Sequence, residues 1–284
     1  MSAIDKYFYN PTFPLYHYTS ISALEGIATH RTVWASHIYY LNDSAELIHA
    51  REVLQEMLEM KFLISGAENS KDDFAVCFDE WLKNLFSSKL HNIFVFSMSQ
   101  EQSLLSQWRS YTPHGKGVSI AFAPIRVAAI AEMNEFRLGK CLYDSSSHHA
   151  LLTALIAELQ SRFEYAAHPT PENYNIHFDK YVSDILQVLS LIKHKAFEEE
   201  KEWRFISNLL PEASKKIDFR QGEGAAMLVP YTKLELGDED WIFDNVTVGP
   251  TPHEKLASSA LLGFLHKHRV CRAVGSGDLP FRKW

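Results

Sequence analysis

Two glutamates and one arginine alternate near the start of a predicted strand late in the chain. Residues 198–205 read EEEKEWRF, which places Glu200, Glu202 and Arg204 at every second position. Because successive side chains of a strand point to opposite faces, these three point to the same face. Two carboxylates beside a guanidinium group suit stabilisation of a developing positive charge, and they equally suit a structural ion pair between Glu202 and Arg204. The spacing alone leaves both interpretations open.

Other polar and aromatic residues gather at the ends of predicted elements. They are His17, Tyr18 and Thr19 on a first strand, Tyr40 after a second, Ser97 and Ser99 on a third, and Trp108 on the next helical turn. The first strand runs into a helix start, where free backbone N–H groups can meet a ligand. His17 also fits a hydrogen-bonded core histidine. Trp34, Trp108 and Trp203 have apolar neighbours, which is more typical of core aromatics than of ligand platforms.

The common motifs of metal and nucleotide chemistry are missing. Fourteen histidines are present, but neither His148-His149 nor His266-x-His268 has the spacing of the zinc motif His-Glu-x-x-His. The nucleophile elbow Gly-x-Ser-x-Gly, the P-loop and the Gly-x-Gly-x-x-Gly fingerprint are absent as well. We therefore expect no metal, no hydrolase triad and no Rossmann dinucleotide site.

Composition and charge indicate an ordinary globular protein of the cytoplasm. The 284 residues carry 28 Lys and Arg against 35 Asp and Glu, a formal charge of -7 that argues against general affinity for duplex DNA. Cys77, Cys141 and Cys271 are scattered and form neither a disulfide framework nor a Cys-x-x-Cys pair. Residues 1–10 have no basic stretch followed by an apolar run, and nowhere do about 18 apolar residues stand together, so we expect neither secretion nor a membrane span. We expect a cytoplasmic protein without membrane contact.

Hydrophobic periodicity predicts strands near both ends of the chain and helices between them. Strands are expected near residues 13–20, 33–36, 93–98, 118–122, 202–207, 226–229, 246–248 and 270–274. Helices are expected over 21–27, 45–62, 73–90, 103–111, 150–165, 174–197 and 253–266. Asn42, Asp43 or Ser44 is suited to cap the second helix, as Ser20 or Thr19 is to cap the first. We predict one α+β domain over residues 1–284 with a helical insertion at about 145–200.

A series of short motifs forms a specific combination, although each motif is weak alone. The motifs are Leu15-Tyr16-His17-Tyr18-Thr19, Trp34-Ala35-Ser36, Leu41-Asn42-Asp43-x-x-Glu46, Phe96-Ser97-x-Ser99, Gln107-Trp108-x-x-Tyr111, Gly115-x-Gly117-Val118, Lys201-Glu202-Trp203-Arg204, Pro230-Tyr231, Val246-x-Val248-Gly249-Pro250 and Pro280-Phe281-Arg282. This combination resembles the bacterial family of unknown function DUF2971. The resemblance runs over nearly the whole chain, from about residue 14 to residue 283.

The DUF2971 family is in turn similar to the ADP-ribosyltransferase superfamily, whose members bind NAD in a cleft of a split sheet. That similarity implies that His17 binds the adenosine-side ribose. The second motif position falls either on Tyr40, which would stack on nicotinamide, or on Ser97 with Ser99, which would support the sheet. Glu202 would hold the 2′-hydroxyl of the nicotinamide ribose.

The same similarity implies roles for the remaining candidates. Glu200 would engage the acceptor, as the first acid of a Glu-x-Glu pair does, although its place in a run of glutamates makes coincidence an alternative. Tyr18, Thr19 and Trp108 complete the expected NAD-binding set, and Arg204 would either contact the diphosphate or act as an ion-pair partner. The choice between Tyr40 and Ser97 stays open, and the long helical insertion before Glu202 departs from the superfamily pattern.

The chemistry explains why these residue types are needed. Departure of nicotinamide leaves an oxocarbenium-like ribose, which an anionic carboxylate stabilises. The expected function is NAD-dependent transfer of ADP-ribose to a protein or nucleic acid, in toxin action or phage defence, and Glu202→Gln is expected to abolish turnover without unfolding the protein. An NAD glycohydrolase with water as acceptor, or a non-catalytic module that binds a nucleotide or partner, is the alternative.

Overall fold

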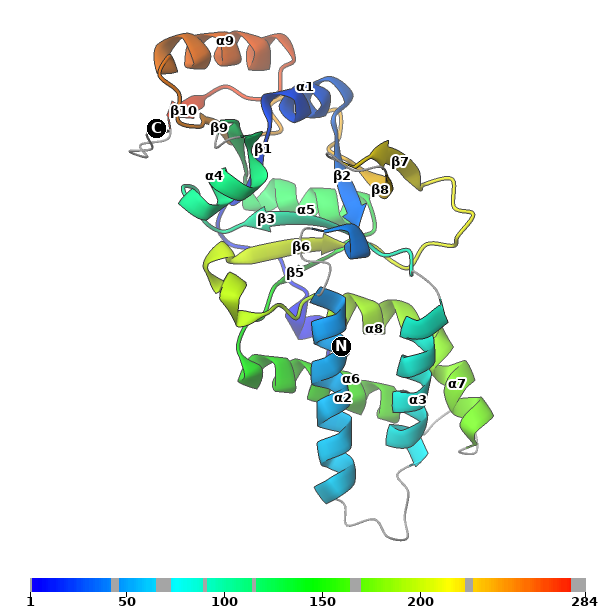
Figure 1. The fold of residues 1–284 in the computed structure, drawn as a ribbon. Coiled ribbons are helices and arrows are strands. Elements are labelled where there is room, and N and C mark those ends of the chain that lie inside the picture. Colours follow the sequence, from blue (N-terminus) through cyan, green and yellow to red (C-terminus); the bar gives the residue numbers. More distant parts are fainter. Residues whose placement is uncertain are drawn as a thin grey trace.

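The computed structural model describes residues 2–41, 46–64, 73–88, 91–113, 116–163, 170–222 and 227–276. Within these residues the chain has a mixed α+β fold around one large sheet (Figure 1). The predicted helix caps Asn42, Asp43 and Ser44 lie outside the described residues, and so do Gly115 and the closing motif at 280–282.

Most strands lie close to where the sequence predicts them, but the sequence does not predict the strands at residues 137–140 and 218–221. They are β1 (Leu15–Thr19), β2 (Thr32–His37), β3 (Phe94–Ser99), β4 (Val118–Phe122), β5 (Arg137–Lys140), β6 (Glu202–Ile206), β7 (Asp218–Gln221), β8 (Leu228–Glu235), β9 (Asn245–Val248) and β10 (Val274–Ser276). The strand predicted at 270–274 is wrong, because Val270 and Cys271 are fully buried in the turn after the last helix and pairing starts only at Val274.

The helices agree with the periodicity except at residues 124–133, where no helix is predicted, and near residue 190. They are α1 (Ile21–His30), α2 (Glu46–Ile64), α3 (Asp73–Ser88), α4 (Leu105–Tyr111), α5 (Pro124–Met133), α6 (Ser145–Phe163), α7 (Pro171–Lys180), α8 (Val182–Leu189) and α9 (Glu254–Lys267), with 3-10 turns η1 (Asp5–Tyr7), η2 (Ile38–Tyr40) and η4 (Lys195–Glu200). Ser20 caps α1 through its side chain, as predicted. The single helix expected over 174–197 is instead two, interrupted at Tyr181 and ended at Leu189, after which the chain leaves the helix to bridge to Leu142.

β3 has three neighbouring strands, and this makes the sheet fork. β6 pairs antiparallel with one edge of β3 from Val95 to Ser99. On the other edge β2 pairs with the start of β3, at Val95, whereas β1 pairs with its end, at Ser99. β1 and β2 therefore diverge along β3. In the described part of the chain no strand pairs with this edge of β3 at Ser97.

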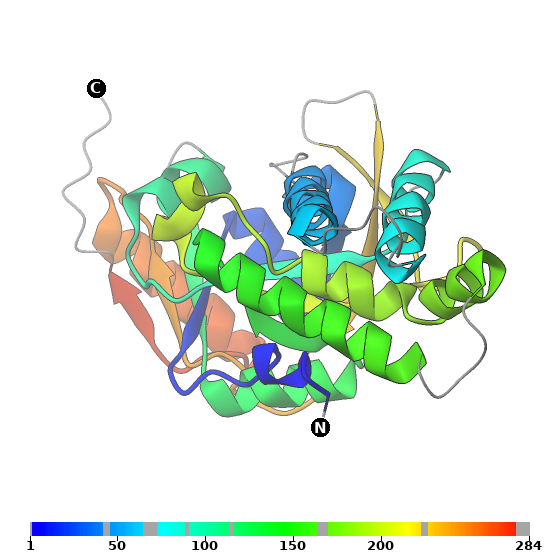
Figure 2. The same ribbon diagram turned by 90° about the horizontal axis from the view of Figure 1, so that it is seen from below.

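Two hydrophobic cores form, one on each face of the sheet. On one face, which we call the α8 face, Val95 and Ile206 pack with helices α2, α3, α6, α7 and α8. On the other, the α5 face, Phe96 and Phe205 pack with α1, α5 and α9. Seen from below, α6 runs across the foreground while α2 and α3 are seen nearly end-on (Figure 2). The α8-face helices thus come from two chain segments, of which the predicted insertion at about 145–200 supplies one.

Candidate functional site

Glu202 and Arg204 lie on the α8 face, as alternation along the strand predicts. Ile206 follows with the same period and belongs to the α8-face core. Ser99 and Ser97 of β3 are the register partners of Glu202 and Arg204, so they share that face. The structure therefore brings these four residues together on two adjacent strands.

A buried ionic cluster surrounds Glu202. Its Oε1 accepts a hydrogen bond from Arg204 Nε at 2.7 Å, and its Oε2 accepts from Arg204 Nη2 at 3.0 Å and from Lys193 Nζ at 2.6 Å. Lys193 Nζ also donates to Oε2 of Glu200 at 2.6 Å, and Arg204 Nη1 donates to the carbonyl of Ser190 at 2.8 Å. None of the four charged side chains is more than 13% exposed. Two positive and two negative charges are thus balanced almost out of contact with water.

The charges of this cluster keep Glu202 ionised. Burial alone would raise the pKa of the Glu202 carboxyl, but Arg204 and Lys193 overcome that effect and hold the pKa well below its usual range. The backbone N–H of Glu202 donates to the hydroxyl oxygen of Tyr143 at 2.8 Å. Burial raises the pKa of Tyr143, so this phenol stays protonated. A permanent carboxylate therefore stands at the start of β6.

Glu200 is the more accessible of the two carboxylates. Its side chain is 13% exposed and that of Glu202 is 7% exposed. Glu200 lies before the start of β6, because Lys201 turns the chain with a left-handed backbone (φ 43°). The predicted alternation along one strand therefore does not extend from Glu202 to Glu200. Tyr111 of α4 donates to Glu200 Oε1 at 3.4 Å, and the Ser99 hydroxyl donates to the Glu200 carbonyl at 2.7 Å. Glu200 therefore joins α4, β3 and the ionic cluster.

His17 lies on the α5 face, opposite to Glu202. Its register partner Ile120 and its neighbour Phe96, with ring centroids 4.5 Å apart, belong to the α5-face core. Its Nδ1 bonds to the backbone carbonyl of Ser97 at the fork, at 3.1 Å. A carbonyl only accepts, so Nδ1 carries the proton and Nε2 is the free acceptor of the neutral ring. Burial lowers the pKa of His17 to about 4, against the raising effect of that hydrogen bond.

Tyr18 and Trp108 pack against each other between β1 and α4. Their rings meet edge to face with centroids 5.1 Å apart, and the Tyr18 hydroxyl donates to the carbonyl of Glu101 at 2.6 Å. Trp108 is 1% exposed, and a Cβ at Gly249 would lie 2.7 Å from its ring. Trp108 is therefore a core residue that anchors α4, and Thr19 is likewise buried at the end of β1.

Tyr40 lies at the opposite end of β3 from the ionic cluster. Its ring contacts His37, with centroids 5.5 Å apart, and His37 pairs with the first residue of β3. Glu202 pairs with Ser99, the last residue of β3. Because five residues of a strand span about 17 Å, Ser97 lies nearer to Glu202 than Tyr40 does.

A half-exposed tryptophan stands beside the fork, where sequence reasoning expected a core aromatic. Trp34 of β2 is 49% exposed and stacks on Tyr231 of β8, with ring centroids 4.4 Å apart. Ser36 pairs with Val95, and the two strands are antiparallel. Two residues before Ser36, Trp34 is therefore level with Ser97, which lies two residues after Val95, and both are on the α8 face. The core interpretation is therefore wrong for Trp34, although it is confirmed for Trp108 and Trp203, each 1% exposed.

Sequence reasoning also missed Lys193 and Tyr143. Lys193 is 3% exposed and follows the apolar residues Leu191 and Ile192. A lysine directly after a buried apolar run was a usable signal, because lysine is almost never buried without a partner. Tyr143 gives no such signal, since tyrosine is often half-buried in any core.

The structure adds three observations on metals, cysteines and membranes. Among the described residues, no group of three or more His, Cys, Asp and Glu side chains is arranged to hold a metal ion. Cys77, Cys141 and Cys271 are buried, and none of them forms a disulfide within the described residues. Over the same residues no helix combines the length and the apolar character needed to cross a membrane.

Buried histidines predict loss of stability in acid. His37 is 1% exposed, and burial lowers its pKa to about 4, against the raising effect of Asn92. Between about pH 6.5 and that value the unfolded chain binds a proton at this ring and the folded chain does not, so stability falls as pH falls, by on the order of 2–3 kcal/mol. Urea unfolding across this pH range should show the loss. His37→Asn should reduce the loss by that amount, while His17, whose pKa burial also lowers to about 4, maintains a similar contribution. An unchanged pH dependence would contradict the assignment to His37.

Comparison with known proteins identifies one related family. Residues 107–205 match the family model described as "Protein of unknown function (DUF2971)". This stretch begins in α4 and ends in β6, so it contains Lys193, Glu200, Glu202 and Arg204. No curated protein and no solved structure matches the chain. The match supports the family resemblance and leaves the activity to be argued from the site.

Proposed function

We propose that this protein is an NAD-dependent ADP-ribosyltransferase that modifies a protein or nucleic-acid acceptor. The fork in the sheet carries the proposal. β1 and β2 part at Ser97, His17 bonds to the backbone there, and Glu202 stands on the adjacent strand β6. A sheet that splits beside a permanent carboxylate is what the resemblance to the ADP-ribosyltransferase superfamily leads one to expect.

The reaction would place each carboxylate in a separate role. The bond between C1′ of the nicotinamide ribose and the ring nitrogen breaks, and neutral nicotinamide leaves with the bonding electron pair. The positive charge that develops on the ribose is stabilised by the ionised carboxylate of Glu202. The acceptor attacks C1′, and its proton passes to Glu200, the more accessible carboxylate.

Binding of NAD would require local rearrangement at Glu202. Both of its carboxylate oxygens already accept hydrogen bonds from Arg204 and Lys193. A ribose 2′-hydroxyl would have to replace one of the two donors on Oε2. Arg204 is 1% exposed and its guanidinium is engaged by Glu202 and Ser190, which supports its role as an ion-pair partner rather than a diphosphate ligand. Trp34 offers a half-exposed aromatic surface on the same sheet face.

A non-catalytic binding module is the second candidate, and one observation favours it. The carboxylate of Glu202 is fully engaged within a charge-balanced cluster, and this suits a structural role as well as a catalytic one. A module of this kind would bind a nucleotide or partner at the fork and release no nicotinamide. An NAD glycohydrolase would use the same site with water in place of the acceptor.

Release of nicotinamide from NAD tests the proposal directly. The purified protein is incubated with NAD, alone and with cell extract as a source of acceptors, and free nicotinamide is quantified by chromatography. Labelled ADP-ribose attached to a macromolecule is expected only when an acceptor is present, whereas release without attachment would identify a glycohydrolase. Bound NAD without any release, with and without extract, would overturn the transferase proposal in favour of the binding module.

A further inference from the structure

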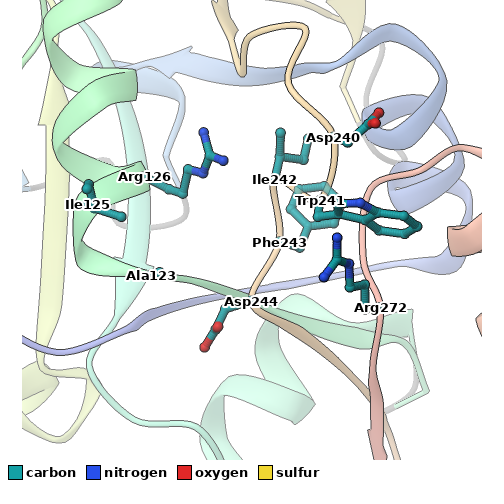
Figure 3. A pocket seen from close by; sticks show the side chains of 9 residues that line it. All are labelled: Ala123, Ile125, Arg126, Asp240, Trp241, Ile242, Phe243, Asp244 and Arg272. Carbon is teal, nitrogen blue, oxygen red and sulfur yellow. The ribbon is translucent and has the colours of Figure 1, made fainter.

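A cavity with charged walls lies beside the ends of strands β4 and β9. Its volume is about 370 Å³, within the range of about 300–1,000 Å³ typical of small-molecule sites. It is lined by Ala123, Ile125, Arg126, Asp240, Trp241, Ile242, Phe243, Asp244 and Arg272. These residues come from the start of α5, from the loop between β8 and β9 and from the segment before β10. Figure 3 shows this cavity from close by.

Two arginines approach the cavity from different walls (Figure 3). Arg272 is exposed, and its guanidinium lies over the ring of Trp241, 4.7 Å from the centroid. In the described part of the chain this guanidinium makes no hydrogen bond or ion pair. Arg126 stands in the first turn of α5, and its Nη1 pairs with Glu239 at the surface. Stacking on Trp241 fixes the plane of Arg272 while leaving its N–H donors available.

The lining of the cavity carries charges of both signs, because Arg126 and Arg272 stand with Asp240 and Asp244. The charged groups at and beside it are the arginines Arg31, Arg126, Arg269 and Arg272 and the carboxylates Glu239, Asp240 and Asp244. Asp240 is paired with Arg269 and lies 3.9 Å from Arg31, so its charge is already balanced. The chain as a whole carries -7. The α5 N-terminus, whose cap residue Ala123 has no side-chain hydrogen bond, adds the positive end of a helix dipole.

From this arrangement we propose that the cavity binds the phosphate group of a small organic phosphate. Arg272 with its available N–H donors, Arg126 on a second wall and the start of α5 suit an anion with several acceptor oxygens. The cavity volume leaves room for an organic remainder, which would contact Ile125 and the partly exposed Trp241. The inference is independent of the proposed transferase activity, because it involves neither the fork nor the ionic cluster of Glu202.

Calorimetric titration of the full chain at low salt tests this site. The probes are adenosine monophosphate and glucose 6-phosphate, with uncharged adenosine and glucose as their matched controls. Both phosphates are expected to bind and the uncharged compounds are not, and added salt should weaken binding. Arg272→Ala and Arg126→Ala should each weaken binding by about 10- to 100-fold, as loss of a hydrogen bond to a charged group does.

Two further variants separate this site from general surface charge. Lys255→Ala removes an exposed cation of α9 that does not line the cavity, so phosphate binding should stay within about twofold of the wild-type value. Glu239→Gln frees Arg126 from its surface ion pair and should tighten binding. Equal binding by wild type, Arg126→Ala and Arg272→Ala would overturn the proposal, as would no heat of binding for either phosphate at millimolar concentration.

Discussion

Glu202→Gln is expected to lower the free energy of unfolding by about 3–5 kcal/mol, the usual result of removing one partner from a buried ionic cluster. The substitution keeps the size of the side chain but removes one of two negative charges that balance Lys193 and Arg204. Both cations are at most 3% exposed and cannot recover that loss by contact with water. Urea or thermal unfolding of the purified variant measures the change.

A second substitution shows whether charge balance is the cause. Lys193→Met combined with Glu202→Gln restores neutrality, leaving Arg204 with Glu200, and replaces a buried ammonium with an apolar chain of similar length. The double variant should therefore be more stable than the Glu202→Gln single variant, because replacement of a buried ion pair by apolar groups is often nearly neutral. Glu199→Gln, on an exposed residue of the same acidic run, should unfold like the wild type. Additive losses in the double variant would contradict the charge-balance argument.

This result changes how loss of activity at Glu202 must be interpreted. From the sequence, Glu202→Gln is expected to abolish turnover without affecting the fold. Because Glu202 is held by Arg204 and Lys193, an inactive variant is informative only if it is still folded under the assay conditions. Activity is therefore to be measured well below the unfolding midpoint of each variant.

The parts of the fold that follow from local sequence were predicted, and those that depend on tertiary contacts were not. β4 was predicted at its observed bounds, because β-branched and apolar residues predominate between a glycine turn and Pro124. The helix expected to continue to residue 197 ends at Leu189. Beyond it the Ser190 carbonyl accepts a hydrogen bond from Arg204, and Lys193 donates one to Glu202. Such long-range pairing leaves no periodic signal.

The candidate site shows the same division. Alternation of Glu202 and Arg204 on one face was predicted from strand geometry and is observed. The position of His17 on the opposite face follows from the register of β1 with β4, where His17 meets Ile120, and no local pattern encodes that register. Exposure of Trp34 likewise depends on which helices cover the sheet, because its apolar neighbours predict burial equally well.

Glu200→Gln is expected to reduce transfer of ADP-ribose to a macromolecular acceptor by about 100-fold or more while nicotinamide release persists, if the proposed function holds. Glu200 is at the entrance of the cluster and contacts Lys193 and Tyr111, so an acceptor can approach it without displacing Arg204. As the base that takes the acceptor's proton, it contributes a factor of about 10²–10⁴. Glu202 is untouched, so charge stabilisation at the ribose remains.

The measurement that separates these two steps uses one reaction mixture. NAD labelled in its adenine moiety reports transfer to macromolecules, and chromatography of the same sample reports nicotinamide. Glu199→Gln, which removes a neighbouring exposed carboxylate, should leave both signals at the wild-type level. A parallel fall of both signals in folded Glu200→Gln would assign Glu200 to ribose chemistry instead. Unchanged transfer would exclude Glu200 from the reaction. Its role would then be structural, because the buried Lys193 pairs with Glu200 as well as with Glu202.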